Sequence, residues 1–585
     1  MSSTVRRALA GVALFLPSAL AAQDAVPRPN VLLVIADDVG FTDLGAYGSE
    51  IRTPHIDALA ARGVLFANFH TSPMCSPSRA MLLTGVDSHT AGLGNLSVAT
   101  PRRHKRSPAY QGRLRDDVLT LGTRLRAEGY RTYFSGKWDL GHTRETLPSS
   151  RGFDRTFALD ATGADNFEKR SYLPIYDEPP WYADGEPTDL PDDFYSSEFL
   201  VDTMIEFLED GDADRPFFGV LSFQAVHMPV QAPREFTARY DGTYDEGWEA
   251  LRARRVQGAR ERGLVSPRSS ASQRPLQSAW DDLAEEERAL AAKSMAVQAG
   301  MLEAMDHHLG RLLRHLDRDG SDDTVVFVLS DNGPEAADPF GTFGFAAWLD
   351  RAGYRRDLET LGEKGSYAFI GPDFARAIAG PLAYYKFHSG EGGVRVPLIV
   401  SGPGVAASGV TQSFAFATDI APTVLELCGA ATTTPEGKAP IVGRSLLPIL
   451  LDASAHAHPA GEAVAFETAG HAAVFKDDHK LVRVGAPAGD REWQLYDLAA
   501  DPGETLDLSA SQPERAAELL ADYERFAEEV GVLAMPPFYT PQRQLMVTYL
   551  AGRGRWIVAM SVALVLAFAV LVVLGARRFQ RRKLA

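Results

Sequence analysis

The chain has 585 residues, of which 45% are apolar and 23% are charged, and it carries a formal net charge of -17 at pH 7. This length exceeds one average domain, and this composition is that of a folded enzyme, which excludes a disordered polymer. The acidic net charge argues against nucleic acid as a partner.

The first segment has the layout of a secretory signal peptide. Arg6 and Arg7 precede an apolar run that is broken by Pro17, and small residues at Ala19 and Ala21 form a cleavage pattern. We therefore predict that residues 1–22 are removed on export. The alternative, a buried N-terminal helix, is disfavoured because the run is short and opens with two arginines.

Short apolar runs then alternate with helical patterns. The alternation predicts an α/β domain over residues 28–429, in which helices sandwich a large, mostly parallel sheet. The predicted strands are residues 31–36, 131–135, 217–222, 324–329 and 396–400. One helix is predicted before Tyr130, beginning near Asp116 and Asp117 and ending at Gly129.

A further helix is predicted to begin at Cys75. In the sequence Cys75-Ser76-Pro77-Ser78-Arg79 the proline suits the first turn of a helix, and Gly85 suits its end. The free N–H groups and the dipole of a helix N-terminus favour an anion. Cys75 is there either a low-pKa thiolate nucleophile or a buried small residue, and the second cysteine, Cys428, also permits one disulfide.

A charged stretch at residues 246–316 is rich in Arg, Glu and Ala, and its periodicity predicts surface helices and an insertion. After residue 429, strand patterns at 463–466, 472–475, 480–484 and 493–498 precede a helical pattern at 513–532. They predict a smaller α+β subdomain over residues 430–540. Substrate selectivity is expected in these two parts and in residues 160–193, which include Trp181.

Residues 541–585 are predicted to be a linker, a transmembrane helix and a basic tail. Residues 556–576 contain no charge, and at about 1.5 Å per residue this length matches the hydrocarbon thickness of a bilayer. A buried core helix is disfavoured, since core helices are seldom uncharged all round over six turns. The basic residues that follow stay in the cytoplasm, which leaves the catalytic domain in the periplasm or outside the cell.

Removing the seven basic residues of the two ends changes the net charge from -17 to -24. Attraction of an anionic substrate must therefore come from cations gathered in a pocket.

Polar residues stand where four of the predicted strands end. They are Asp37 and Asp38, Lys137, His227, and Asp331 with Asn332. The carboxyl ends of parallel strands meet at one edge, so these side chains are expected to converge. Three carboxylates and one amide oxygen suit a hard cation, calcium or magnesium, and not zinc. An Asp pair is also a common helix cap, but a second acidic pair in the same context favours a metal site.

Several motifs in this chain resemble the sulfatase family, and the layout is closest to the bacterial arylsulfatases. The most specific is C-x-P-x-R at Cys75 to Arg79, followed by LLTG. The others are NVLLVIADDVG, GKWDLG, the His227-Met-Pro segment, VLSDNG, KFHSGEGGVRVP and QLYDLAADPGETLDL. The resemblance implies an alkaline-phosphatase-like fold and hydrolysis of sulfate monoesters. It also implies that a formylglycine-generating or sulfatase-maturing enzyme oxidises Cys75 to formylglycine (3-oxoalanine).

The resemblance further implies a chemistry for each site residue. Hydrated formylglycine at position 75 carries two hydroxyls, so that one attacks sulfur and the other later expels sulfate. Asp37, Asp38, Asp331, Asn332 and residue 75 are expected to hold calcium, with magnesium as the alternative. Arg79 is expected to orient the formylglycine, Lys137 and Lys386 to grip sulfate oxygens, and His227 to donate a proton to the leaving oxygen.

One position departs from the family pattern. Where the common motif reads G-K-W-H-L-G, this chain has Asp139 in place of the histidine that takes the proton from the second hydroxyl. Our hypothesis is that Asp139 is the base for this elimination. His142, three residues on, is the alternative group for the role.

Two other functions remain open from the sequence. One is a formylglycine-dependent phosphonate or phosphodiester hydrolase, because these enzymes share the fold and metal pairs. The other is a catalytically silent surface protein that binds sulfated glycans, which only Asp139 favours. The expected substrate of the enzyme is a sulfated small molecule or glycan.

Overall fold

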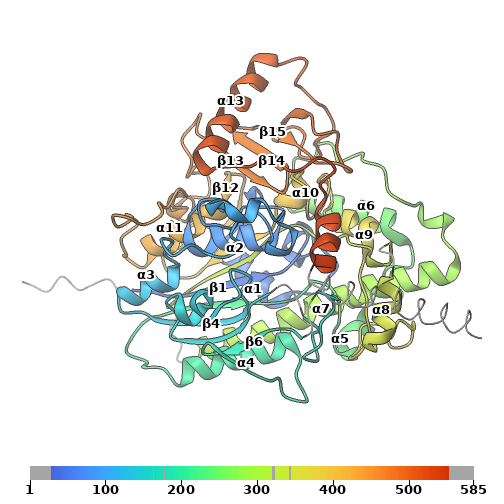
Figure 1. Ribbon diagram of the computed structural model, residues 1–585, viewed down its shortest axis with the longest axis horizontal. Helices are drawn as coiled ribbons and strands as arrows, with labels where there is room; N and C mark the ends of the chain where they lie inside the picture. The colour runs from blue at the N-terminus through green and yellow to red at the C-terminus, as the bar shows by residue number, and fades with distance from the viewer. Residues whose placement is uncertain (1–27, 162–163, 176–177, 319–322, 342–343, 552–585) are drawn as a thin grey trace, which may run out of the picture.

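The computed structural model describes residues 28–161, 164–175, 178–318, 323–341 and 344–551 (Figure 1). The predicted signal peptide, the uncharged stretch at 556–576 and the basic tail lie outside these ranges. Within the ranges, no helix combines the length and apolar character needed to cross a bilayer.

A ten-stranded mixed sheet forms the centre of the molecule, in the order β11-β2-β10-β9-β1-β8-β4-β5-β6-β7. The central strands β9, β1, β8, β4 and β5 run parallel. β10 pairs antiparallel with β9, and β6 pairs antiparallel with β5. β11 pairs parallel with β2, and β2 pairs antiparallel with β10, so these two strands run in the same direction as the centre. The sheet is therefore mixed but mostly parallel, as expected, and β10 and β6 are the strands that run against the others.

The strands of this sheet are β1 Asn30–Ala36, β2 Val64–Phe66, β4 Arg131–Lys137, β5 Arg155–Leu159, β6 Trp181–Ala183, β7 Glu186–Pro187, β8 Phe217–Ser222, β9 Thr324–Ser330, β10 Leu398–Ser401 and β11 Gly409–Thr411. A separate two-stranded pair is formed by β3 Phe69–His70 and β12 Ala415–Phe416.

The direction of β10 follows from the segment that precedes it. The N–H of Lys386 donates to Pro334 O at 3.1 Å and the N–H of Gly333 donates to Gly393 O at 3.0 Å, so residues 386–393 lie against the turn after β9. The chain thus enters β10 from the edge at which the parallel strands end. It has to run back down the sheet, antiparallel to β9.

Alternating side chains of the central strands fill two hydrophobic layers. In β1, Leu32 and Val34 face one layer while Val31, Leu33 and Ile35 face the other, as the two-residue period of a strand requires. The first layer is covered by α1 Pro54–Ala61, α4 Ser196–Glu209, α6 Gly247–Glu261, α7 Glu285–Leu316 and α9 Gly371–Ile378. The second is covered by α2 Cys75–Thr84, α3 Leu121–Ala127, α11 Ile420–Leu427 and α12 Leu447–Leu451 (Figure 1).

The stretch at 246–316 does not consist of surface helices alone: α6 keeps an exposed face, but α7 is largely buried, which corrects that part of the prediction. Its longer helix, α7, packs under the sheet, and Met295, Met301, Met305 and Leu309 are fully buried in the first layer. The charges that suggested a surface helix are concentrated at the two ends of α7, where Glu285, Glu286, Glu287 and Arg314 lie. Alanine and methionine fill the contact face in between.

Two further expectations need correction. Helix α3 begins at Leu121, capped by the Thr120 side chain, while Asp116 and Asp117 lie in the preceding turn and pair with nearby arginines. Trp181 does not line a binding surface, because it is 1% exposed and stacks on Phe157 at 5.1 Å.

The small C-terminal sheet has the predicted α+β character. Its antiparallel strands are β13 Ala463–Thr468, β14 His471–Lys476, β15 His479–Arg483 and β16 Trp493–Asp497, followed by α13 Pro513–Val530. Ala472 and Val474 face α13, while Ala473 and Phe475 face the second layer of the main body. The small sheet therefore lies between α13 and the body (Figure 1). The remaining helices are α5 Arg234–Thr237, α8 Phe345–Ala352 and α10 Glu391–Val394.

Candidate active site

The strand ends meet as predicted. Asp37 and Asp38 follow β1 directly, Asp331 and Asn332 follow β9, and Lys137 is the last residue of β4. Because β1 lies between β8 and β9, and β4 is next to β8, these ends share one edge of the sheet. His227 lies five residues beyond β8 on the same side.

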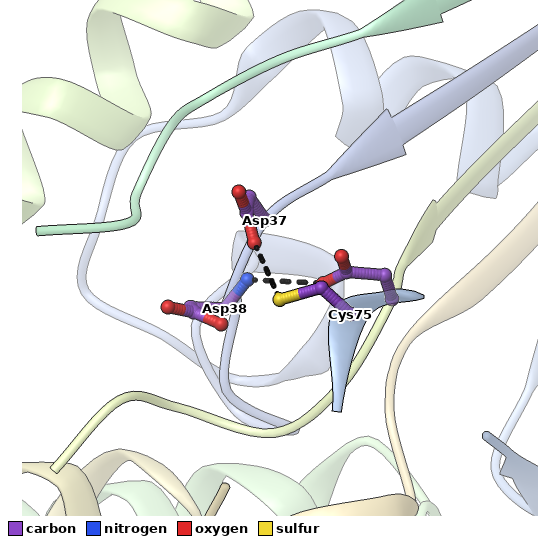
Figure 2. Close-up of side chains that lie close together, drawn as sticks. Asp37, Asp38 and Cys75 are labelled. Atoms are coloured by element: carbon purple, nitrogen blue, oxygen red, sulfur yellow. Dashed lines mark hydrogen bonds between the residues drawn. The ribbon is translucent and has the colours of Figure 1, made fainter. Parts of the chain in front are cut away.

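Cys75 occupies the first turn of α2, which points at this edge. Met74 is the extended cap before it, and Gly85 with φ of 70° ends the helix. Figure 2 shows that the side chains of Asp37, Asp38 and Cys75 lie close together, and the Cys75 Sγ–H donates to Asp37 Oδ1 at 3.5 Å. One ligand atom from each of Asp37, Asp38, Cys75 and Asp331 lies within 4.8 Å of the others.

Asp37 is held by cations. Lys137 Nζ donates to its Oδ2 at 2.6 Å, and Arg79 Nη2 lies 3.9 Å from the same oxygen. Burial alone would raise the pKa of Asp37, but Lys137 and the other nearby cations outweigh burial and hold the pKa below its usual range. The ionised form of Asp37 is therefore favoured.

Asp38 sits in a left-handed conformation with φ of 67°, which turns its carboxylate inward. Lys386 Nζ lies 2.7 Å from its Oδ1, the amide of Asn332 donates to Oδ1 at 2.6 Å, and Glu335 contacts the same ammonium at 3.3 Å. Burial raises the pKa of Asp38 to about 7, because the pull of Lys386 is opposed by the neighbouring Asp37.

Asp331 is joined to Arg79. The Nε–H of Arg79 donates to Asp331 Oδ2 at 2.8 Å, and its Nη1 donates to Lys137 O at 2.7 Å and to Ser222 Oγ at 2.5 Å. Burial and the charge of Asp37 raise the pKa of Asp331 to about 6. Arg79 is thus fixed at three points, between the helix that carries Cys75 and the ends of β4, β8 and β9.

The residues present fit a hard divalent cation. Three carboxylates converge although burial raises the pKa of two of them, and Asn332 Oδ1 is buried without a hydrogen-bond partner among the described residues. An unpaired buried carbonyl oxygen beside like-charged carboxylates is costly unless a cation completes the site. The donors are oxygens, which suits calcium or magnesium.

Cys75 as an unmodified thiol is a poor nucleophile here. Burial and the carboxylate of Asp331 raise its pKa well above the usual range, so the thiolate is disfavoured. Both Cys75 and Cys428 are free, so the disulfide that the sequence permitted does not form. Of the alternatives for an unmodified Cys75, only the buried protonated thiol fits this structure.

His227 is neutral and has a defined tautomer. Burial and the charge of Lys386 lower its pKa to about 4, and its Nδ1–H donates to Met228 O at 2.7 Å. The other nitrogen, Nε2, faces Asp38 Oδ2 at 3.7 Å without a proton of its own. Proton donation by His227 therefore requires Nε2 to take up a proton first.

Asp139 lies at the rim of this group. It is 8% exposed, has a left-handed φ of 56°, and its Oδ2 has no hydrogen-bond partner in the part of the chain that is described. His142 lies beyond it, with Nδ1 3.6 Å from Asp160 Oδ1. A buried carboxylate oxygen without a partner is available to accept a proton from a bound group.

Two contributors were missed by sequence reasoning. Glu335 pairs with Lys386, and the hydroxyl of Ser222 receives Arg79. Ser222 is the last residue of predicted strand β8, so its position at the same edge was a usable signal. Glu335 lies three residues after Asn332 in the loop that follows β9, and this spacing does not predict its contact with Lys386.

Comparison with known proteins points to one family. The model described as "Sulfatase" matches residues 29–430, and a second, described as "N-sulphoglucosamine sulphohydrolase, C-terminal", matches residues 384–522. An uncharacterized sulfatase of Schizosaccharomyces pombe is 35% identical over 87% of this chain and 95% of its own length. An arylsulfatase of Klebsiella aerogenes is 34% identical over 71% of this chain and 90% of its own length.

The fold has solved counterparts. The crystal structure of Ps i-CgsB in complex with k-i-k-neocarrahexaose aligns with a TM-score of 0.62 at 22% identity, covering 89% of this chain and 97% of that one. The arrangement of a mixed sheet with a smaller C-terminal part is therefore shared.

Proposed function

This chain belongs to the sulfatase family of sulfuric ester hydrolases, and on that premise we propose that it hydrolyses sulfate monoesters with a formylglycine derived from Cys75 and a bound calcium ion. The observation that carries the proposal is the convergence of Asp37, Asp38 and Asp331 on Cys75, with the unpaired Asn332 Oδ1 beside them. A buried cysteine that stays unmodified does not require three carboxylates and an unpaired amide oxygen around it.

The modification would supply what the thiol lacks. A hydrated aldehyde at position 75 carries one hydroxyl for attack on sulfur and a second whose deprotonation expels sulfate, so that one displacement becomes two easier steps. Asp37, Asp38, Asp331 and Asn332 would hold the cation, which would polarise the sulfate. Calcium is proposed over magnesium on the family resemblance, since the oxygen ligands suit both.

The other side chains divide the remaining work. Lys137 and Lys386, both 2% exposed or less, present compact positive charges toward the space between the carboxylates and would grip the sulfate oxygens. Arg79, which lies on the same helix as residue 75 and is held by three hydrogen bonds, would orient the formylglycine. Asp139, with its free Oδ2, would take the proton of the second hydroxyl.

We also propose that the chain is exported and anchored by residues 556–576, with the catalytic domain on the outer side of the membrane. The signal-like residues 1–22 and the basic tail after residue 576 support this topology. A maturation enzyme that oxidises Cys75 is then a required partner. The substrate is proposed to be a sulfated small molecule or glycan, and one solved counterpart is in complex with k-i-k-neocarrahexaose.

Turnover of an aryl sulfate and of an aryl phosphonate ester by the purified full chain tests the proposal. We expect the sulfate to be the better substrate. We expect Cys75→Ser to perform no more than one turnover per molecule, because a serine hydroxyl cannot collapse to an aldehyde. A preference for the phosphonate ester would establish the alternative hydrolase, and no hydrolysis of either would favour a silent glycan-binding protein.

A further inference from the structure

The loop that follows β9 carries a carboxylate that the proposed reaction does not use. The side chain of Glu335 is 10% exposed, and its Oε2 lies 3.3 Å from Lys386 Nζ. Its other oxygen, Oε1, accepts the N–H of Ala337 at 2.8 Å. This second contact, within the same loop, fixes the direction of the carboxylate. The pair with Lys386 is therefore not a mobile surface ion pair, which would contribute little.

Lys386 is brought to this place by a segment with a strained backbone. Tyr384 and Phe387, on either side of it, have left-handed φ angles of 68° and 69°. Such angles are costly for residues other than glycine and persist only where the surroundings enforce them. The N–H of Lys386 donates to Pro334 O at 3.1 Å. The N–H of Phe387 donates to Pro73 O at 2.9 Å. The segment is thus tied both to the loop after β9 and to the chain that precedes α2.

The ammonium of Lys386 has two anionic partners. It lies 2.7 Å from Asp38 Oδ1 and 3.3 Å from Glu335 Oε2. One ligand atom from each of Asp38, Glu335 and His227 lies within 4.8 Å of the others, a spacing that a metal ion could also use. Because the ammonium already contacts both carboxylates, a metal ion at this triplet would compete with Lys386 for the same charges. The contacts therefore favour a lysine-binding pair of carboxylates over a second metal site.

The two carboxylates are not equivalent. Asp38 is also a ligand of the proposed cation, whereas Glu335 lies outside the group of ligand atoms that includes Cys75. A divalent ion on Asp38 would share the charge of that carboxylate and would repel the nearby ammonium. Glu335 would then be the carboxylate whose charge is still free to hold Lys386. A buried ammonium without a counter-charge is costly, so without Glu335 it would move away from the site.

We propose that Glu335 is a positioning residue of the sulfatase reaction: its carboxylate keeps the Lys386 ammonium at the active site when a cation occupies Asp38, so that the ammonium can grip the sulfate. This role rests on the proposed sulfatase activity. Glu335 acts through Lys386 and not on the substrate, because a carboxylate and a sulfate repel each other. A carboxylate that only added negative charge to the site would weaken sulfate binding, and its removal would strengthen it. Removal of a positioning carboxylate has the opposite effect.

A double-mutant cycle on aryl sulfate turnover by the full chain tests this coupling. Glu335→Gln removes the charge but keeps the size of the side chain and an oxygen for the N–H of Ala337. We expect kcat/KM to fall by about 10-fold or more when Lys386 is present, as the loss of a charged partner of a buried group implies. In the Lys386→Met background the same change should alter kcat/KM by less than about 2-fold, because the group that Glu335 positions is gone.

Two further variants separate positioning from folding. Glu335→Asp keeps the charge on a side chain that is one carbon shorter, and its kcat/KM should lie between those of the parent and Glu335→Gln. Asp522→Asn is the matched control, because Asp522 is 11% exposed and holds the ammonium of Lys476 at 2.9 Å on α13, beyond the small sheet. It loses a similar ion pair and should leave kcat/KM unchanged.

Binding of inorganic sulfate gives a readout that does not depend on turnover. In the Cys75→Ala background, which lacks the reacting group, we expect Glu335→Gln to weaken sulfate binding by about 5-fold in the presence of calcium, measured by calorimetric titration. The effect should be smaller without calcium, since Asp38 alone can then hold Lys386.

Three results would overturn the proposal. They are a kcat/KM of Glu335→Gln that equals or exceeds that of the parent, equal losses with and without Lys386, and two tightly bound divalent cations in the parent of which Glu335→Gln keeps one. The last result would assign Asp38, His227 and Glu335 to a second metal. A parent that hydrolyses no sulfate ester would refute the proposed function instead, and the sulfate titration would still decide on the role of Glu335.

Discussion

Two of the buried groups of charged side chains in the described part of this molecule are organised in opposite ways. One is the active site around Cys75. The other, which we call the ion network, consists of His70, Glu391, Arg395, Lys480 and Glu504 and joins the small C-terminal sheet to the main body. Both lie near the segment of residues 386–395, so they differ in arrangement more than in depth.

Opposite charges alternate in the ion network. Lys480 Nζ donates to Glu391 Oε1 at 2.8 Å and to Glu504 Oε1 at 2.9 Å. Glu391 Oε2 faces His70 Nε2 at 3.1 Å, and Glu504 Oε2 accepts the N–H of Glu391 at 2.9 Å. Every carboxylate oxygen therefore has a donor within the protein, and the network needs no ligand.

Like charges converge in the active site. Asp37, Asp38 and Asp331 crowd together, burial raises the pKa of the latter two, and the oxygen of Asn332 has no partner among the described residues. The contrast teaches that depth of burial does not separate a structural cluster from a functional one. Convergence of like charge beside an unpaired oxygen does.

Asp38→Asn should give the largest effect on activity. It removes one converging carboxylate, and we expect turnover to fall by about 10³-fold or more, because both the proposed cation and Lys386 lose their partner. The free energy of unfolding of the metal-free protein should change little, since repulsion with Asp37 is also removed. If Asp38→Asn unfolds readily while its folded fraction stays fully active, the distinction between a functional active site and a structural ion network is contradicted.

Lys480→Met should have the opposite signature. It leaves Glu391 and Glu504 buried without their shared cation, and we expect a loss of about 3 kcal/mol in the free energy of unfolding measured with urea. The folded fraction should keep most of its turnover. Adding Glu504→Gln removes one of the stranded charges and should recover part of the stability. A stable Lys480→Met protein with abolished turnover would place the ion network in the catalytic machinery.

Asp139→Asn should slow the second half of the reaction. We expect steady-state turnover to fall by about 10²-fold, the size typical of a lost general base, while sulfate stays bound to the peptide that contains residue 75. Asp139→His is the matched control because it restores the common family residue, and it should retain turnover. Full turnover of Asp139→Asn without trapped sulfate would refute the role of Asp139 as the base that releases sulfate.

The smallest expected effect is a pH dependence of the ion network. Burial lowers the pKa of His70 despite Glu391, and its Nδ1 has no partner among the described residues, as expected of a neutral ring that donates from Nε2. The unfolded chain binds a proton at His70 below pH about 6.5, whereas the folded chain does not. The contribution of His70 to stability is thus fully present above that pH and is lost as the pH falls below it.

His70→Gln lacks this proton uptake. The difference in free energy of unfolding between the parent and His70→Gln should therefore shrink from pH about 7.5 to about 5.5. A difference that grows on acidification would show instead that His70 is charged in the folded protein.

The sequence was sufficient for the central strands and for the residues at their ends. Asp37, Asp38, Asp331 and Asn332 are readable because parallel strands end at one edge, so local order predicts spatial convergence. The strands and the helix of the small sheet could also be predicted, because their patterns of apolar residues are local in sequence. The position of Cys75 on α2 followed from Pro77 and Gly85.

The misses have long-range causes. The direction of β10 depends on the path of residues 386–393 across the sheet edge, and the burial of α7 depends on which face the sheet offers it. The ion network joins His70 to Glu391, 321 positions apart, and Glu391 to Lys480, 89 positions apart, and no local spacing predicts these contacts.

The central claim concerns the side chain at position 75. Mass spectrometry of the peptide that contains it, on the same preparation whose aryl sulfate turnover is measured, tests the claim most directly. We predict that an aldehyde replaces the CH₂SH group and that turnover scales with the fraction converted. A preparation that hydrolyses the ester at full rate with an intact thiol at position 75 would contradict the account.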